Sequence, residues 1–234
     1  YSKFPTIQVA VDANRKNGIE NLLQLSNKPD VILLDDAFQH RKVKAGFYIL
    51  LTAYDDLFCD DYILPFGNLR EPSSGKKRAD MIIVTKCPKD LSEIAQQKIR
   101  EKLKVKQQVF FTTIQYDDFV FGNDSQLLVS EIQSESKVLV AGIAKPKLFF
   151  DFLKNDNDET LVFPDHHDFS KQDCELILAK ANGRKIITTE KDFVRLNGLL
   201  PNEHLFYLPI KSTFLNTNID KTIEDYVGQS SRNS

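Results

Sequence analysis

The chain has few cysteines and no run of apolar residues long enough to span a membrane. Its three cysteines, Cys59, Cys87 and Cys174, are far apart and lack the spacing of a metal site, so we expect reduced thiols of a cytoplasmic protein. No signal-peptide pattern stands at its start. The net charge of −2 and a pI near 6.1 give no basis for nucleic-acid binding. These absences favour a cytoplasmic protein that does not bind nucleic acid.

Two further absences concern the start of the chain and phosphate binding. The sequence contains no Gly-x-x-x-x-Gly-Lys-Ser/Thr motif, whose backbone cradles phosphates in many nucleotide-binding enzymes. It starts at Tyr1 rather than at methionine and moves almost directly into an apolar stretch, Thr6–Val11, which predicts a short strand. We therefore expect a fragment, and a missing segment that holds a phosphate-binding loop or a membrane anchor.

The composition is that of an ordinary globular protein, with 41% hydrophobic and 27% charged residues among 234. Apolar runs typical of buried strands alternate with helical stripes, which predicts an α/β fold. We expect two lobes: a parallel-sheet core over residues 1–116 and a smaller α/β/α lobe over residues 137–234. Residues 117–136 are rich in Asp, Ser, Gln and Gly and predict a two-stranded connector.

The first candidate site follows the apolar run Val31–Leu34, which predicts a strand buried on both faces. Asp35 and Asp36 would then lie at its carboxyl end, where ligands bind in open α/β sheets. Two adjacent carboxylates there can hold Mg²⁺, and Gln39 and His40 can order water or substrate. The plainer alternative is a pair of acids that favour a turn.

The second candidate site is a loop shaped by Pro65 and Gly67. Arg70 follows, and its planar guanidinium suits bidentate binding of phosphate oxygens. Glu71 would join the metal site or orient Arg70. The alternative is an ordinary surface pair of Arg70 and Glu71.

The third candidate site is Asp165-His166-His167-Asp168, between a predicted strand and a helix over residues 170–181 that starts with a capping box. These residues could bind a metal or supply a catalytic histidine. Alternatively an acid caps the helix and both histidine rings are solvated.

Several of these segments resemble the tetraacyldisaccharide 4′-kinase family, which phosphorylates a lipid A precursor in Gram-negative bacteria. Residues 35–40 resemble its Asp-Asp-Gly-Phe-Gln-His signature, and residues 64–72 its Leu-Pro-Ala-Gly-Pro-Leu-Arg-Glu-Pro motif. Residues 163–166 match Phe-x-Asp-His, and residues 189–192 match Thr-Glu-Lys-Asp. Ala37 replaces the glycine of the signature, so we expect no positive φ there.

The resemblance implies a P-loop-type nucleotide core, incomplete in this chain, and an enzyme that uses ATP and Mg²⁺. It implies Asp36, Arg70 and His166 as catalytic residues, with the partner acid of His166 upstream of this chain. Nucleotide and metal would be bound by a wider set: Asp35, Asp36, Gln39, His40, Arg15 and Glu71, of which Asp35 and Asp36 hold the metal. The fragment alone should lack activity.

The resemblance also implies where the enzyme works. The acceptor would be the 4′-hydroxyl of a tetraacylated glucosamine disaccharide, reached at the cytoplasmic face of the inner membrane. We expect a monomer that is peripheral, or anchored through its N-terminus in the intact protein.

Two other functions are open from the residues alone. A metal-dependent phosphoesterase would use Asp35, Asp36, Asp165, His166 and His167 on two ions such as Mn²⁺. A non-catalytic α/β binding module would tolerate replacement of His166 or Asp36.

Overall fold

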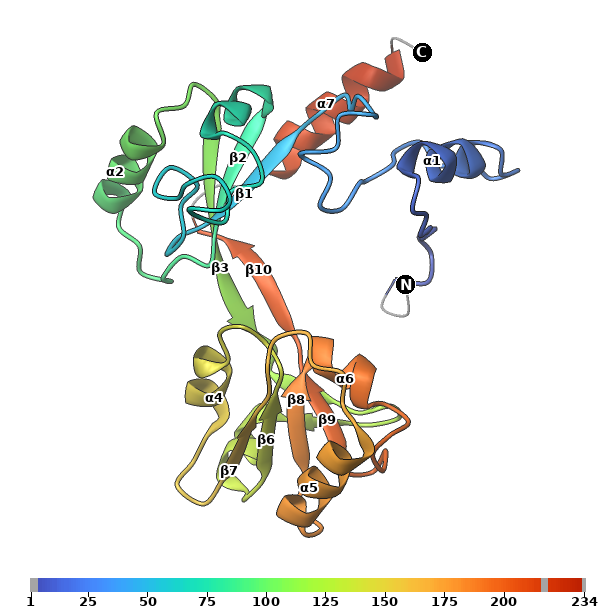
Figure 1. Cartoon of the computed structure of the whole chain (residues 1–234), viewed down its shortest axis with the longest axis vertical. Helices are drawn as coiled ribbons and strands as arrows, with labels where there is room; N and C mark the ends of the chain where they lie inside the picture. Colours follow the sequence, from blue (N-terminus) through green and yellow to red (C-terminus); the bar gives the residue numbers. More distant parts are fainter. Residues whose placement is uncertain (1–3, 216–218, 233–234) are drawn as a thin grey trace. The chain divides into compact units, whose positions relative to one another are not determined.

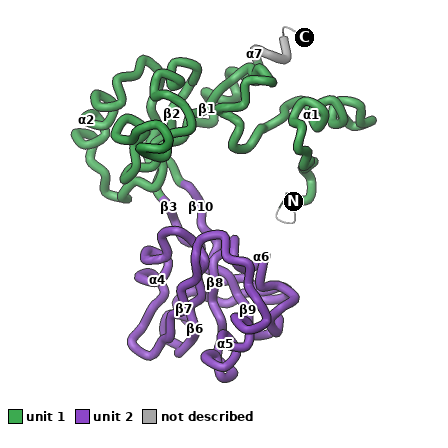
Figure 2. The backbone as a smooth tube through the Cα atoms, in the orientation of Figure 1, with its two compact units in different colours: residues 1–113, 213–234 green, residues 114–212 purple. Residues whose placement is uncertain are grey.

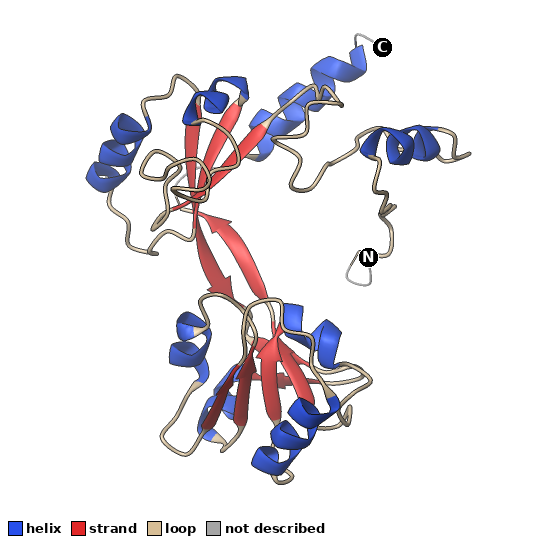
Figure 3. Ribbon diagram, in the orientation of Figure 1, coloured by secondary structure: helices blue, strands red, loops and turns tan. Residues whose placement is uncertain are grey.

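The computed structural model describes residues 4–215 and 219–232, which form two compact units. Unit 1 comprises residues 1–113 and 213–234, and unit 2 comprises residues 114–212 (Figure 2). Each unit has its own sheet with helices (Figure 3), so the expected α/β class is confirmed. The bounds differ from those expected. Residues 117–136 lie within unit 2, and residues 213–234 group with unit 1. The chain crosses between units in strands β3 (Gln108–Tyr116) and β10 (Ile210–Phe214).

Unit 1 is built on a four-stranded sheet in the order β1-β2-β3-β10 (Figure 1). Strands β1, β2 and β3 run parallel. Ile82 and Val84 of β2 face a core that includes Ile99 and Leu103 of helix α2, while Met81 and Ile83 pack with Ile219, just before α7. The bounds are β1 Ile49–Ala53, β2 Met81–Thr85, β3 Gln108–Tyr116, β10 Ile210–Phe214, α1 Arg15–Leu23, the 3-10 helix η1 Ser73–Arg78, α2 Glu93–Leu103 and α7 Asp220–Arg232.

The strands expected at residues 6–11 and 31–34 are absent from this structure, and those two predictions are wrong for it. Residues 31–34 form no strand within the described part of the chain, and Leu33 is 90% exposed. An extended segment becomes a strand only when a neighbour satisfies its backbone N–H and C=O groups. The first strand of the described chain is β1, which pairs with β2.

Unit 2 is a six-stranded sheet in the order β5-β4-β9-β8-β6-β7, with the last four strands parallel. Alternate residues of β6 face opposite sides: Val138 and Val140 pack toward α5 and α6, and Leu139 and Ala141 toward α3 and α4. The predicted α/β/α layering of this unit is therefore present. The bounds are β4 Phe119–Phe121, β5 Gln126–Leu128, β6 Val138–Ala141, β7 Glu159–Val162, β8 Ile186–Thr189, β9 Leu205–Leu208, α3 Val129–Ser134, α4 Lys147–Leu153, α5 Lys171–Ala181 and α6 Glu190–Leu196.

The helices are short, and local chemistry fixes their ends. The Ser92 side chain caps the start of α2, and the C-cap residue Lys104, just after its end, adopts the left-handed conformation with φ 49°. Ser170 and Asp173 form the predicted capping box of α5. Among the described residues, no helix has both the length and the apolar content needed to cross a bilayer.

The three cysteines are free thiols, as expected. Cys87 and Cys174 are buried, and desolvation raises the pKa of the Cys87 thiol to about 11. Because the thiolate is the reactive form of cysteine, Cys87 is a packing residue rather than a nucleophile.

Unit 2 contains a fully buried ion pair. Lys137 Nζ lies 2.6 Å from Asp158 Oδ2, and both side chains are 0% exposed. The Asp158 carboxylate also accepts the backbone N–H groups of Lys137 and Asn155 at 3.0 and 2.8 Å. This pair fixes the start of β6 to the turn before β7, since a buried charge is tolerated only when it is paired.

Replacing Lys137 with methionine should leave the Asp158 carboxylate buried and unpaired. We expect Lys137→Met to lower the free energy of unfolding of unit 2 by about 3–5 kcal/mol. Amide hydrogen exchange in β6 measures this, because it reports on unit 2 alone. Lys180→Met is the matched control: Lys180 pairs with Glu159 at 3.1 Å but is 49% exposed. Its loss should stay below about 1 kcal/mol. Equal losses in the two variants would contradict the prediction.

Candidate functional site

In unit 1, an ion pair brings the first two candidate sites together. Arg70 Nη1 donates to Asp36 Oδ2 at 3.0 Å, although the two residues are 34 positions apart. Both side chains are mostly exposed, 65% for Arg70 and 68% for Asp36. The positive φ of this turn, 42°, falls on Asp36 and not on Ala37, in line with the expectation for Ala37.

Arg15 also reaches this cluster. It begins α1, whose N-cap is Asn14. Arg15 Nη2 donates to the carbonyl oxygens of Asp35 and Asp36, at 3.4 and 3.2 Å. Because these bonds go to the backbone, Arg15 holds the turn without engaging the two carboxylates.

Glu71 lies between two arginines. Its Oε1 accepts from Arg78 Nη2 at 2.6 Å, and its Oε2 accepts from Arg41 Nη2 at 3.2 Å. The hydrogen bond from Arg78 and then that from Arg41 lower the pKa of Glu71. Arg78 also donates to the carbonyl of Phe38, with its guanidinium 4.8 Å from the ring centre. Glu71 therefore ties the loop that carries Arg70 to the segment that follows Asp36.

Gln39 and His40 are placed differently. Gln39 lines a small cavity together with Arg70 and Glu71. The backbone N–H of His40 donates to the carbonyl of Ala37 at 2.9 Å and closes the turn after the two acids. The structure thus brings Gln39 to Arg70, and it shows His40 closing the turn.

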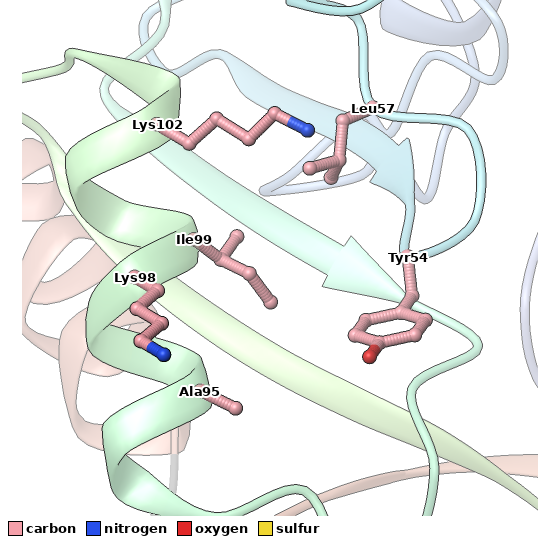
Figure 4. Close-up of a pocket in the computed structure, with 6 residues that line it drawn as sticks. All are labelled: Tyr54, Leu57, Ala95, Lys98, Ile99 and Lys102. Carbon is pink, nitrogen blue, oxygen red and sulfur yellow. The ribbon is translucent and has the colours of Figure 1, made fainter.

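A larger cavity of about 350 Å³ lies elsewhere in unit 1 (Figure 4). Side chains of α2 and of the segment after β1 line it, among them Lys102, which pairs with Asp60 at 2.6 Å. Its lining consists of Tyr54, Leu57, Ala95, Lys98, Ile99 and Lys102. No residue of the three candidate sites is in that set.

In unit 2, the third candidate site is a turn after β7. His166 adopts a positive φ of 60°, which costs about 1–2 kcal/mol for a residue with a Cβ. Asp165 Oδ1 accepts the His166 backbone N–H at 3.0 Å and the Lys191 ammonium at 3.0 Å. The bond from Lys191 is the main cause of the lowered pKa of Asp165. The turn leaves the His166 side chain 72% exposed.

Helix α6 supplies the rest of this cluster. Thr189 caps it, and Asp192 is 0% exposed. Asp192 Oδ2 accepts from Thr189 Oγ1 at 2.7 Å and from the Gly142 N–H at 2.8 Å. Lys191, the residue before Asp192, extends to His166, with Nζ 3.3 Å from His166 Nε2.

Arg195 is a member of this cluster that the sequence analysis missed. Arg195 Nη2 lies 3.4 Å from His166 Nδ1, and its Nη1 lies 3.4 Å from Asp192 Oδ1. The available signal was spacing: Arg195 follows Lys191 by four residues, so both face the same side of the helix.

His167 does not share the surroundings of His166. His167 Nε2 lies 3.0 Å from Asp173 Oδ2, and its ring stacks on Phe163 with centres 5.0 Å apart. Bonds from the Ser170 hydroxyl, the Ser170 backbone and then His167 lower the pKa of Asp173 to about 2. His167 is thereby tied to the start of α5.

No group of three or more His, Cys, Asp and Glu side chains suited to a metal ion occurs within residues 4–215 and 219–232. The two-metal phosphoesterase needs such groups. That alternative has no support.

Comparison with known proteins agrees with the motifs. Residues 1–227 match the family model described as tetraacyldisaccharide-1-P 4′-kinase. A tetraacyldisaccharide 4′-kinase of Flavobacterium johnsoniae is 63% identical over 231 residues, 97% of this chain and 68% of that protein. A protein of the same name from Phocaeicola vulgatus is 42% identical over 254 residues, 99% of this chain and 69% of its own.

A solved structure supports the fold. The chain resembles the LpxK of Aquifex aeolicus, crystallised with ATP, with a TM-score of 0.62 and 24% identity. The match covers 92% of this chain and 61% of that one, so the chain spans less than two thirds of the Aquifex protein. With the family match along residues 1–227, the chain belongs to the tetraacyldisaccharide-1-P 4′-kinase family and so to the phosphotransferases.

Proposed function

We propose that the enzyme transfers the γ-phosphoryl group of ATP to the 4′-hydroxyl of a tetraacylated glucosamine disaccharide 1-phosphate, a lipid A precursor. The observation that carries this proposal is the Asp36–Arg70 ion pair at 3.0 Å, because it joins the two motifs that most resemble the family. Phosphoryl transfer depends on positioning and charge stabilisation, and these two side chains supply both signs of charge.

The acids of unit 1 would hold Mg²⁺. Their oxygen donors fit this ion, which binds proteins through one or two carboxylates plus phosphate oxygens and water. Asp36 is 68% exposed, and Arg15 holds the adjacent carbonyl groups rather than the carboxylates. Asp35 and Asp36 would therefore hold Mg²⁺, and the ion would neutralise charge on the ATP phosphates.

Arg70 would act on the phosphoryl group itself. Its guanidinium is exposed, and Gln39 and Glu71 line the cavity beside it. Arg70 would exchange its carboxylate partner for the equatorial oxygens of the transferred group and balance the charge that develops there. Glu71, held by Arg41 and Arg78, would keep the loop in place.

His166 would assist activation of the acceptor hydroxyl. Its side chain is 72% exposed, while the turn that carries it is fixed by Asp165 and α6. A histidine in this state can exchange a proton or a hydrogen bond with a carboxylate base near the hydroxyl.

The chemistry of the acceptor also bears on where the enzyme would work. Four acyl chains keep the disaccharide in a bilayer, so the enzyme would work at a membrane surface, which we assign to the cytoplasmic face of the inner membrane. We expect the enzyme to be a monomer. It would be peripheral or anchored through its N-terminus. Co-sedimentation of the intact protein with inner-membrane vesicles tests this, and full recovery in the supernatant would count against it.

Arg70→Met should slow phosphoryl transfer by about 10²–10³-fold in kcat, since a donor to the transition-state oxygens is lost. The assay follows label from γ-labelled ATP into the disaccharide with Mg²⁺ and the intact protein. Stability should change by less than about 1 kcal/mol, because the ion pair is exposed. Arg100→Met is the control: Arg100 packs on Phe111 at 4.8 Å and should keep full activity. Unchanged transfer in Arg70→Met would remove Arg70 from the reaction.

His166→Ala should lower kcat by about 10²–10⁴-fold with little change in the KM for ATP. His204→Ala, in the same unit, should behave like wild type. If both variants keep full transfer, His166 has no part in the chemistry. A wild-type protein that labels no lipid but releases phosphate from esters with Mn²⁺ would overturn the kinase proposal itself.

A further inference from the structure

We propose that Arg195 is a positioning residue that fixes the tautomer of His166, with the ring proton on Nε2. The inference rests on the proposed function only where it gives His166 a part in the reaction. Its geometric basis is the approach of Arg195 Nη2 to His166 Nδ1 at 3.4 Å.

A guanidinium group can donate hydrogen bonds but cannot accept them. Arginine carries five N–H donors, has no acceptor and stays protonated in proteins. A bond from Arg195 therefore needs a lone pair on Nδ1 of His166. In a neutral imidazole one ring nitrogen is unprotonated and has a lone pair, while the other carries the hydrogen. Contact with Arg195 at Nδ1 thus places the hydrogen on Nε2.

The groups on the other side of the ring are an acceptor and a second cation. Asp165 Oδ2 is an acceptor 3.8 Å from His166 Nε2. Lys191 Nζ lies 3.3 Å from Nε2 and, like arginine, can only donate, so this contact alone would favour the opposite tautomer. A neutral ring offers one lone pair, and the Lys191 ammonium has a nearer acceptor in Asp165 Oδ1, at 3.0 Å. The ring therefore has a donor at Nδ1 and a carboxylate on its Nε2 side, with the lysine bound to that carboxylate.

Arg195 is itself held by the interior of unit 2. Its other terminal nitrogen contacts Asp192 Oδ1 at 3.4 Å, and Asp192 is fully buried. Asp192 is fixed in turn by Thr189 and by the backbone of Gly142. A Cβ at Gly142 would lie 3.1 Å from Asp192 Oδ1 and 3.3 Å from the carbonyl of Pro164. A glycine here therefore allows the end of β6, helix α6 and the His166 turn to meet.

The fixed tautomer has a chemical consequence. With Nδ1 occupied by Arg195, neutral His166 presents only an N–H donor at Nε2. His166 would then donate to an oxygen, of a carboxylate base or of a phosphoryl group, rather than take a proton from the hydroxyl. The assignment agrees with a histidine that supports a separate carboxylate base.

The direct test is to measure which ring nitrogen of His166 carries the hydrogen. Long-range ¹H–¹⁵N spectra of the labelled chain distinguish bare from protonated ring nitrogens, and a His166→Gln spectrum assigns His166 among the four histidines. At a pH where the ring is neutral, we expect a bare Nδ1 and a protonated Nε2. A predominantly Nδ1–H ring in the wild-type chain would overturn the proposal without any Arg195 variant.

Variants give the second test. Arg195→Met should leave His166 as a mixture of tautomers, and Arg195→Lys, which keeps a charge near Asp192, should restore part of the Nε2–H population. Arg184→Met is the matched control, since Arg184 also pairs with a carboxylate and is 27% exposed, against 24% for Arg195. Arg184→Met should leave the tautomer of His166 the same as in the wild-type protein. If folded Arg195→Met shows the same His166 tautomer as the wild-type protein, Arg195 does not fix it. If Arg195→Met does not fold, an unchanged tautomer in folded Arg195→Lys would refute the role of Arg195.

Kinetics then separate this inference from the proposed function. In the intact protein, Arg195→Met should lower kcat at least tenfold with little change in KM, and Arg184→Met should not. Loss of activity in His166→Ala but not in Arg195→Met would refute positioning by Arg195. Full activity in both variants, with the expected tautomer, would leave the tautomer assignment standing and remove His166 from the mechanism.

Discussion

The site in unit 2 depends on the buried carboxylate of Asp192. One carboxylate joins the end of β6 through Gly142, the end of β8 through Thr189 and the last turn of α6 through Arg195. A buried charge is costly unless every oxygen is satisfied, so these partners lock one another in place. These contacts around Asp192 let the exposed side chain of His166 keep a defined orientation. The strained φ of His166 is then a local cost that the surrounding contacts offset.

Unit 1 achieves order by different means. Apart from Arg15, which begins α1, its candidate residues lie on loops. Glu71 is only 15% exposed in its pairs with Arg41 and Arg78, whereas both side chains of the Asp36–Arg70 pair are mostly exposed. An exposed pair contributes little to stability, and its partners exchange easily. This suits side chains that must release one another to take up a phosphate or a metal ion. The apolar framework beneath, from Ile82 to Leu103, supplies the stability that the loops lack.

Much of this organisation could be predicted from the sequence. The capped helices of unit 2 and the α/β class follow from local patterns, and the motif resemblance led to the family. The strand at residues 31–34 could not be judged locally, because a strand depends on its neighbours. The connector was placed at 117–136 by composition, whereas those residues pair as β4 and β5 in the sheet of unit 2. Arg195 was missed because its role arises from the turn 29 residues earlier, which the sequence does not place beside it.

Two adjacent histidines show why residue type alone does not define a site. His167 faces the Asp173 carboxylate, stacks on Phe163 and is 25% exposed, so its ring is part of the fold. His166 faces the donor Arg195 and is 72% exposed, so its ring is oriented yet accessible. A general acid, base or donor must be both fixed and reachable. Of these two histidines only His166 meets both conditions, and it does so because α6 contributes a cation where α5 contributes a carboxylate.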